Sequence, residues 1–171
     1  MATRTLPDPK EIRRAFDYDP IMGTLRWAIT PGGPMVKKGD RAGTVWKAER
    51  VRVQYRGLKV EAGPLIWCWM SGEWPPVGLM VDHKNGNALD NRWENLRIAS
   101  NSQNQANSRI CRSNRSGFKG VSFNKAANKW VATIQHGGEL IYIGGFGSAQ
   151  EAHMAYQSTQ TQLHGDYARR V

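Results

Sequence analysis

Apolar and polar residues alternate over short distances along most of this chain, a pattern that predicts short strands rather than long helices. Before residue 80 the alternation predicts four strands, near residues 24–28, 43–46, 50–55 and 58–61. The strongest apolar run extends from Leu65 to Met70 and fits either a buried helix or a buried strand. We therefore expect an α+β lead-in over residues 1–80.

One short helix is expected near the start of the chain. Asp8-Pro9 supplies an N-cap followed by a proline at the first helical position, and Ile12, Ala15 and Phe16 then place apolar side chains on one face. The turn-forming segment from Asp19 to Gly23 should end this helix.

The last third of the chain has a different pattern, with three alternating segments followed by one helical segment. The segments 117–123, 129–134 and 140–146 predict three antiparallel strands joined by short turns. Ser148 and Glu151 form a capping box that opens a helix ending before Gly165. The residues expected to face this helix are Val121, Phe123, Ala132, Ile134, Ile141 and Ile143. Those expected on the opposite face are Ser122, Asn124, Val131, Thr133, Gln135, Leu140 and Tyr142.

Between these parts, residues 81–104 predict a strand, a loop, a second strand and a helix. Asp82 and His83 end a short apolar run, and the residues from Asn85 to Asn87 tolerate the positive φ angles of a sharp turn. A second strand is expected at 95–99, and the capping box of Ser100 and Gln103 opens a helix that carries Asn104.

This central unit has the residues of a metal-dependent hydrolytic site. Carboxylate and amide oxygens, as in Asp82 and Asn104, are hard donors suited to Mg²⁺, and His83 can take a proton from water near neutral pH. Taken alone, an Asp-His pair before an Asn-Gly turn is more often a hydrogen-bonded surface turn. An EF-hand is excluded, because its acidic spacing and closing glutamate are missing.

The full string D-H-x-N-G-N-x-x-D-N-R-x-x-N-L-R, followed by S-Q-N-Q-x-N, resembles the HNH endonucleases of phages and mobile introns. The resemblance implies a ββα-metal (His-Me finger) fold that holds a divalent cation, Mg²⁺ or Mn²⁺, against a DNA phosphate. It places Asp82 and Asn104 as metal ligands, His83 as the general base, and Asn95 as the asparagine that braces the loop. For Asn95 a catalytic and a structural role are equally open, because an asparagine that braces a loop is structural in mechanism even where activity depends on it. Related phage proteins usually carry His-Arg where this chain has Gly63-Pro64.

The composition of the chain indicates what kind of molecule the protein binds. The formal net charge is +10 and the excess is spread along the chain, which favours an anionic partner, first of all double-stranded DNA. Cys68 and Cys111 form no C-x-x-C pair, so no zinc site is expected. No apolar run approaches the ~20 residues of a membrane span, and we expect the protein to act in the cytosol of a phage-infected or bacterial host.

Residues 107–116 are polar and basic, a composition typical of a flexible linker. Its three arginines, Arg109, Arg112 and Arg115, are spaced to follow a DNA groove, although a plain solvated tether fits equally well. Lys37 and Lys38, in an earlier loop, are open to the same two interpretations.

Residues 117–167 resemble the APETALA2 (ethylene-response-factor) DNA-binding domain, through G-V, K-W-x-A-x-I, I-G-x-F and the A-x-E-A-x-x-A-Y helix. The resemblance implies that the three-stranded sheet lies in the DNA major groove. Fewer arginines than in the plant members suggest looser base recognition, although these residues could also form a solvated sheet surface. The candidate DNA-contacting residues here are Lys119, Ser122, Asn124, Lys125, Lys129, Thr133, Gln135 and Tyr142.

Four segments are thus predicted: a lead-in over 1–80, an HNH core over 81–106, a basic linker over 107–116 and a DNA-binding domain over 117–171. The expected function is that of a homing-type HNH endonuclease, acting as a monomeric, site-preferring nickase that leaves 5′-phosphate and 3′-hydroxyl ends. A non-cleaving DNA-binding regulator is the alternative, because the sheet, the linker and the charge require no catalysis.

Overall fold

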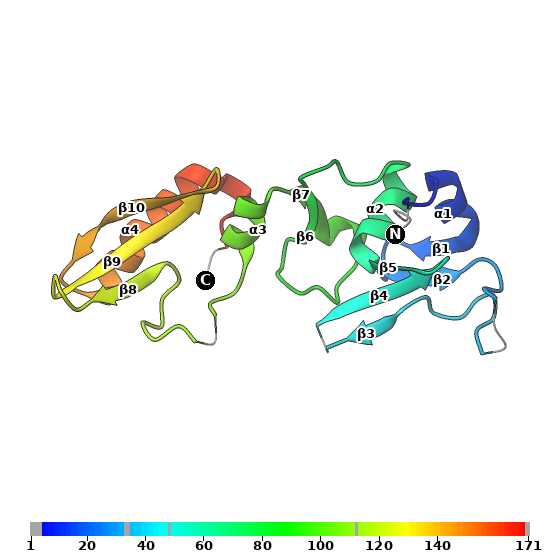
Figure 1. Ribbon diagram of the computed structural model, residues 1–171, viewed down its shortest axis with the longest axis horizontal. Helices are drawn as coiled ribbons and strands as arrows, with labels where there is room; N and C mark the ends of the chain where they lie inside the picture. Colours follow the sequence, from blue (N-terminus) through cyan, green and yellow to red (C-terminus); the bar gives the residue numbers. More distant parts are fainter. Residues whose placement is uncertain (1–4, 33–34, 48, 112, 170–171) are drawn as a thin grey trace. The chain divides into compact units, whose positions relative to one another are not determined.

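The computed structural model describes residues 5–32, 35–47, 49–111 and 113–169, which form an α+β protein with four helices and four small antiparallel sheets in that part of the chain (Figure 1). The chain divides into two compact units, Met1–Ala99 and Ser100–Val171. Each unit has its own hydrophobic core.

The first unit is built on two short helices and three of the sheets. Its helices are α1 (Pro9–Ala15) and α2 (Ala62–Ser71). Its strands are β1 (Phe16–Asp19), β2 (Thr24–Trp27), β3 (Thr44–Trp46), β4 (Arg50–Tyr55), β5 (Leu58–Glu61), β6 (Met80–His83) and β7 (Leu96–Ala99), with the 3-10 turn η1 (Trp93–Asn95) before β7. They pair as β1-β2, β3-β4-β5 and β6-β7.

Helix α2 lies at the centre of this unit. It contains the apolar run from Leu65 to Met70, which is therefore a helix and not a strand. Leu65, Ile66 and Cys68 are almost fully buried in the core that also contains Phe16 and Val53. Gly72 ends the helix in the left-handed conformation (φ 83°), where a residue with a β-carbon would be strained.

The four strands predicted before residue 62 are present, but the first helix is shorter than expected. Helix α1 ends at Ala15, and Phe16 begins β1 instead of continuing the helical face. Burial alternates along β1, with Phe16 and Tyr18 inside and Asp17 outside, because the strand pairs with β2 across one face of the core. The spacing of three apolar residues predicted a helix, but a period-two pattern begins at the last of them.

The second unit contains α3 (Asn101–Asn107), a three-stranded sheet and α4 (Ala149–His164), followed by the 3-10 turn η2 (Gly165–Tyr167). The sheet has the order β10 (Glu139–Phe146), β9 (Lys129–His136), β8 (Val121–Asn124), and α4 packs against one of its faces (Figure 1). The three strands and the helix predicted from residue 117 are therefore present, although the first strand begins at Val121 and not at residue 117.

Most of the predicted helix-facing side chains are inside this unit. Val121, Ala132 and Ile134 are buried under α4, and Ile143 packs against them. Phe123 and Ile141 are more exposed than predicted, with 45% and 37% of their surface open to solvent.

The region predicted as a flexible linker is folded in part by its own hydrogen bonds. The Asn114 side chain accepts a hydrogen bond from the amide of Gly117 (2.9 Å) and donates one to the carbonyl of Phe118 (2.9 Å). The boundary between the compact units falls at Ser100, so α3 belongs to the second unit although the predicted HNH core extends to residue 106. The functional division into four segments stays a prediction.

Candidate active site and DNA-contacting residues

Strand β6 delivers Asp82 and His83 at its carboxyl end, as the pattern predicted. Asp82 is opposite Arg97 in the antiparallel pairing of β6 with β7, and Arg97 Nε donates to Asp82 Oδ2 at 2.9 Å. Both side chains are largely buried. The Asp82 side chain is 5% exposed to solvent and the Arg97 side chain is 13% exposed. A buried carboxylate needs such a partner, because the loss of hydration is costly for an isolated charge.

His83 faces the loop that follows β6. Its Nε2 lies 3.1 Å from Oδ1 of Asn91, a residue that is itself buried. Helix α2 approaches the same imidazole, since a β-carbon added at Gly63 would lie 3.7 Å from Cε1 of His83. Position 63 therefore lies beside His83.

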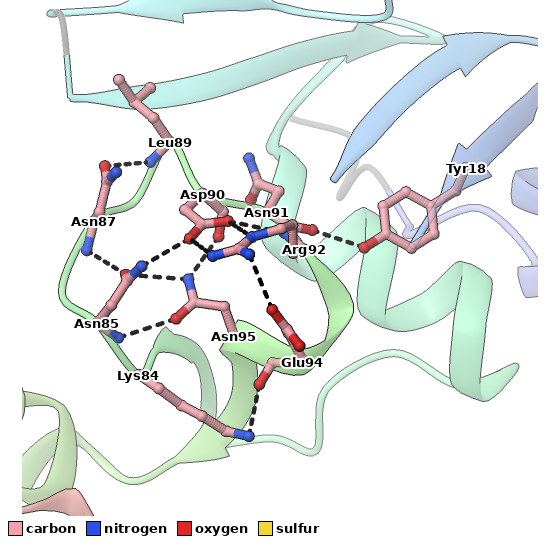
Figure 2. Close-up of polar contacts among 10 residues, drawn as sticks. All are labelled: Tyr18, Lys84, Asn85, Asn87, Leu89, Asp90, Asn91, Arg92, Glu94 and Asn95. Carbon is pink, nitrogen blue, oxygen red and sulfur yellow. Dashed lines mark hydrogen bonds and ion pairs between the residues drawn. The ribbon is translucent and has the colours of Figure 1, made fainter. Parts of the chain in front are cut away.

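Asn91 is held in place from the far side of the first unit. The hydroxyl of Tyr18, on β1, donates to the Asn91 carbonyl at 2.7 Å (Figure 2). Burial, together with the charges of Asp19 and Asp90, raises the pKa of Tyr18 to about 12, so this donor keeps its proton at neutral pH. Asn91 was not among the site residues predicted from the sequence. The signal for it was its place in the D-N-R string, beside two residues with evident roles.

Asn95 braces the loop of residues 84–95 through both ends of its side-chain amide (Figure 2). Its Oδ1 accepts from the amide of Asn85 at 3.0 Å, and its Nδ2 donates to Asn85 Oδ1 at 3.1 Å and to the carbonyl of Asp90 at 2.7 Å. The side chain is 6% exposed. These contacts are the bracing expected of Asn95, and they tie the two ends of the loop together.

An ion pair stiffens the far end of the loop. Arg92 Nη2 is 2.8 Å from Oδ2 of Asp90, and its Nε donates to Oδ1 at the same distance, so the contact is bidentate. The hydrogen bonds from Arg92 and Asn85 lower the pKa of Asp90 to about 2. Asp90 is therefore ionised at neutral pH and acts as an anchor within the loop.

Asn104 lies on α3 in the second unit, whereas Asp82 and His83 lie in the first. The predicted capping box is present, with Ser100 Oγ accepting from the amide of Gln103 at 3.2 Å and Gln103 Oε1 accepting from the amide of Ser100 at 2.8 Å. This cap fixes the start of the turn on which Asn104 is located. The structure thus places Asp82 and His83 next to each other at the end of β6. Asn104 lies on α3, which belongs to the other compact unit.

Comparison with known proteins finds a family for the segment that contains these residues. The model of the HNH endonuclease family matches residues 64–106, the segment from α2 through the braced loop to α3. Protein 3.8 of Escherichia phage T7 is 32% identical over 105 residues, which cover 61% of this chain and 86% of that protein. This chain belongs to the HNH endonuclease family. No solved structure matches it.

The family match ends at residue 106, so the resemblance of residues 117–167 to the APETALA2 domain stays a prediction from their sequence. In the part of the chain that the structure describes, no helix is both long and apolar enough to cross a membrane. Within the same residues, no group of three or more His, Cys, Asp or Glu side chains could hold a metal ion.

The residues predicted to read DNA lie on the face of the β8-β9-β10 sheet opposite to α4. Ser122, Asn124, Gln135 and Tyr142 are exposed, and Thr133 is half-buried beside its partner Tyr142 in the register of β9 and β10. Asn124 has a second role, because its Oδ1 accepts from the amides of Ala126 and Ala127 and shapes the β8–β9 turn. Other exposed candidates are Lys125, Lys129, Arg109 and Arg115; Arg112 lies outside the described residues.

The structure gives Lys119 a role that differs from the predicted DNA contact. Its ammonium donates to the carbonyls of Gln105, Ala106 and Ser108 at 2.6–2.7 Å, at the carboxyl end of α3. Burial, with the nearby Arg169, lowers the pKa of Lys119 to about 8. All three of its protons are used within the protein, so Lys119 stabilises α3 and is not part of the exposed sheet face.

Proposed function

We propose that this protein is a metal-dependent DNA endonuclease of the HNH homing type, which hydrolyses a phosphodiester bond to leave 5′-phosphate and 3′-hydroxyl ends. The observation that carries this proposal is the pair Asp82 and His83 at the end of β6, with His83 in contact with the buried Asn91. The match of residues 64–106 to the HNH endonuclease family supports the same reaction.

His83 acts as the general base that takes a proton from the attacking water. When Nε2 carries the imidazole proton, it donates to Asn91 Oδ1, and the basic lone pair is then on Nδ1. Asn91 is fixed by Tyr18, so the ring is held in one orientation before substrate binds. Such a positioned base contributes roughly 10²–10⁴-fold to a hydrolytic rate.

Asp82 and Asn104 would hold the cation, Mg²⁺ or Mn²⁺. Bound there, it would supply Lewis-acid stabilisation of the charge that develops on the phosphate and on the leaving 3′-oxygen. A carboxylate and an amide oxygen fit a magnesium ion, which keeps several waters and takes few protein ligands, often together with substrate phosphates. Within the protein, the charge of Asp82 is balanced by the neighbouring guanidinium of Arg97.

The second unit would select the site. Its sheet presents the polar side chains of Ser122, Gln135 and Tyr142 on an exposed face, a shape and chemistry suited to base edges in a major groove. The APETALA2 resemblance supports this use of the sheet. Only a few side chains could read bases, so we expect a preference among sites instead of one strict target.

The protein would work as a monomer on double-stranded DNA in the bacterial cytosol, and one molecule would cut one strand. The chain carries one Asp82-His83 pair and no repeat of it. The similarity to a protein of phage T7 supports a setting of phage infection.

The test is incubation of the purified protein with a random-sequence duplex library and Mg²⁺, followed by mapping of the new ends on both strands. We expect 5′-phosphate ends that concentrate at a subset of sequences, and no new ends in EDTA. The His83→Ala protein is the matched control. If the wild-type protein yields no more ends than this control while still binding the library, it is a non-cleaving DNA-binding protein.

A further inference from the structure

The β3-β4-β5 sheet of the first unit has one face in the core and one face in solvent. Val51 and Val53 of β4 point inward, with 7% and 0% of their surface exposed. Arg50, Arg52 and Gln54 alternate with these valines along β4 and point outward. Their cross-strand partners on β3 and β5 lie on the same face. Arg52 is paired with Thr44 and Glu61, Arg50 with Trp46, and Gln54 with Lys59.

This outward face is basic around an exposed aromatic ring. Trp46, on the edge strand β3, is 39% exposed and has the guanidinium carbon of Arg52 3.6 Å above its ring centroid. The ammonium of Lys47 is 4.5 Å from the same centroid. Two cations are therefore gathered on one indole, where they repel each other and attract an anion.

The charges on this face differ in how they are compensated. Arg50 is paired with Glu61 at 2.9 Å. Arg52 and Lys47 form no ion pair with any residue that the structure describes, although Glu49 lies in the same β3–β4 turn. A guanidinium that stacks on an aromatic face keeps the N–H fork at its edge available, in the geometry that binds a phosphate with two hydrogen bonds.

We propose that this face, centred on Trp46, Lys47 and Arg52, is a second DNA-binding surface that holds the phosphate backbone of the duplex. It rests on the proposed function, because a nuclease must hold DNA, and it adds a contact in the first unit to the sheet of the second. Trp46 is a positioning residue, which orients Arg52 without reading a base. The surface should act equally on all sequences, since it contacts phosphates alone.

The experiment measures the salt dependence of binding to a labelled duplex in EDTA, so that cleavage plays no part. Each phosphate neutralised contributes about 0.9 to the slope of log K against log salt concentration. We expect Arg52→Gln to lower the slope by about one and the double variant Lys47→Gln/Arg52→Gln by about two. Trp46→Leu should weaken binding as Arg52→Gln does, and Trp46→Phe should restore it.

Arg56→Gln is the control, because it removes the same charge from an arginine whose guanidinium is already paired with Glu11 at 2.6 Å. If the Lys47 and Arg52 variants have the slope of this control, the surface does not bind phosphate. Cleavage in Mg²⁺ by the wild-type protein would in that case leave the proposed function standing. Conversely, a slope that falls as expected in a protein that cuts no DNA would overturn the nuclease and leave the surface.

Discussion

At the scale of single residues, the two neighbours Asp82 and His83 have different partners, in keeping with the different roles proposed for them. Asp82 is buried against Arg97, and its negative charge is kept in the interior by that contact. His83 is in contact with a neutral amide, that of Asn91. This contact orients the imidazole ring, as the proposed role of His83 toward the attacking water requires.

Replacing His83 tests its assignment as the base. We expect His83→Ala to lower the single-turnover cleavage rate by ~10²–10⁴-fold and to leave DNA affinity nearly unchanged, because the imidazole acts on water and not on the binding of the backbone. His136→Ala, which removes an exposed histidine from the other unit, should cleave at the wild-type rate. Wild-type cleavage by the His83 variant would remove it from this role.

Replacing Asp82 must separate catalysis from folding, because its carboxylate has a structural partner. Asp82→Ala removes the carboxylate that faces the largely buried Arg97 and should cost about 3–5 kcal/mol of unfolding free energy. The double variant Asp82→Leu/Arg97→Met should recover most of that stability in denaturant unfolding and should still not cleave. Cleavage by the stable double variant would show that the metal does not depend on Asp82.

At the scale of elements, the loop of residues 84–95 is a rigid connection between β6 and β7. Asn95 bonds to both of its sides, and Asp90 pairs with Arg92 at its far end (Figure 2). The consequence is that Asn91 is held between two anchored residues, so the partner of His83 does not depend on a mobile segment.

The Asp90 anchor makes part of the stability depend on pH. Its folded-state pKa of about 2 is below the ordinary value of about 4, so the ionised form stabilises the folded protein above about pH 4. That contribution is lost as the pH falls through the folded-state value. Thermal unfolding of wild type and Asp90→Asn should differ most above pH 4 and converge near pH 2. A difference that is constant from pH 6 to pH 2 would contradict the assignment.

The sheet of the second unit can be tested without disturbing α3. A protein truncated at Ser116 would lose Lys119 and Gln160, which donate to the last carbonyls of α3, and so would confuse the two units. The double variant Gln135→Ala/Tyr142→Ala removes only exposed side chains. We expect it to cleave with scattered site choice at a similar total rate. End mapping that matches the wild-type pattern would exclude this face from site selection.

At the scale of the whole molecule, positive charge is shared by the two units, whereas the Asp82-His83 pair lies in the first. Both units are basic by sequence, but the Asp82-His83 pair occurs once. A dimer that cuts a palindrome would need a self-complementary interface in addition to these parts.

The single pair predicts that strands are cut one at a time. With a supercoiled plasmid carrying one preferred site, open-circle DNA should accumulate before any linear product, at every enzyme concentration below that of the plasmid. Direct conversion to linear DNA under these conditions, without a nicked intermediate, would indicate a dimer.

The sequence was sufficient to predict those helices and strands that are specified by residues close together in the chain. The Ser100–Gln103 cap, the strands of the second unit, and the strand that ends in Asp82 and His83 follow from residues within a few positions of each other. The bracing role of Asn95 also followed from its motif. These features are set by short-range hydrogen bonds and by alternation, which a linear pattern records.

Which distant groups contact Asp82 and Asn91 depends on tertiary packing. Tyr18 reaches Asn91 across 73 residues of sequence, and Arg97 meets Asp82 because two strands pair in one register. The same holds for Lys119, which a charge pattern assigned to DNA and which folding buries at the end of α3. The sequence shows which side chains are charged, but whether a charged group faces solvent or a carbonyl depends on how the elements pack.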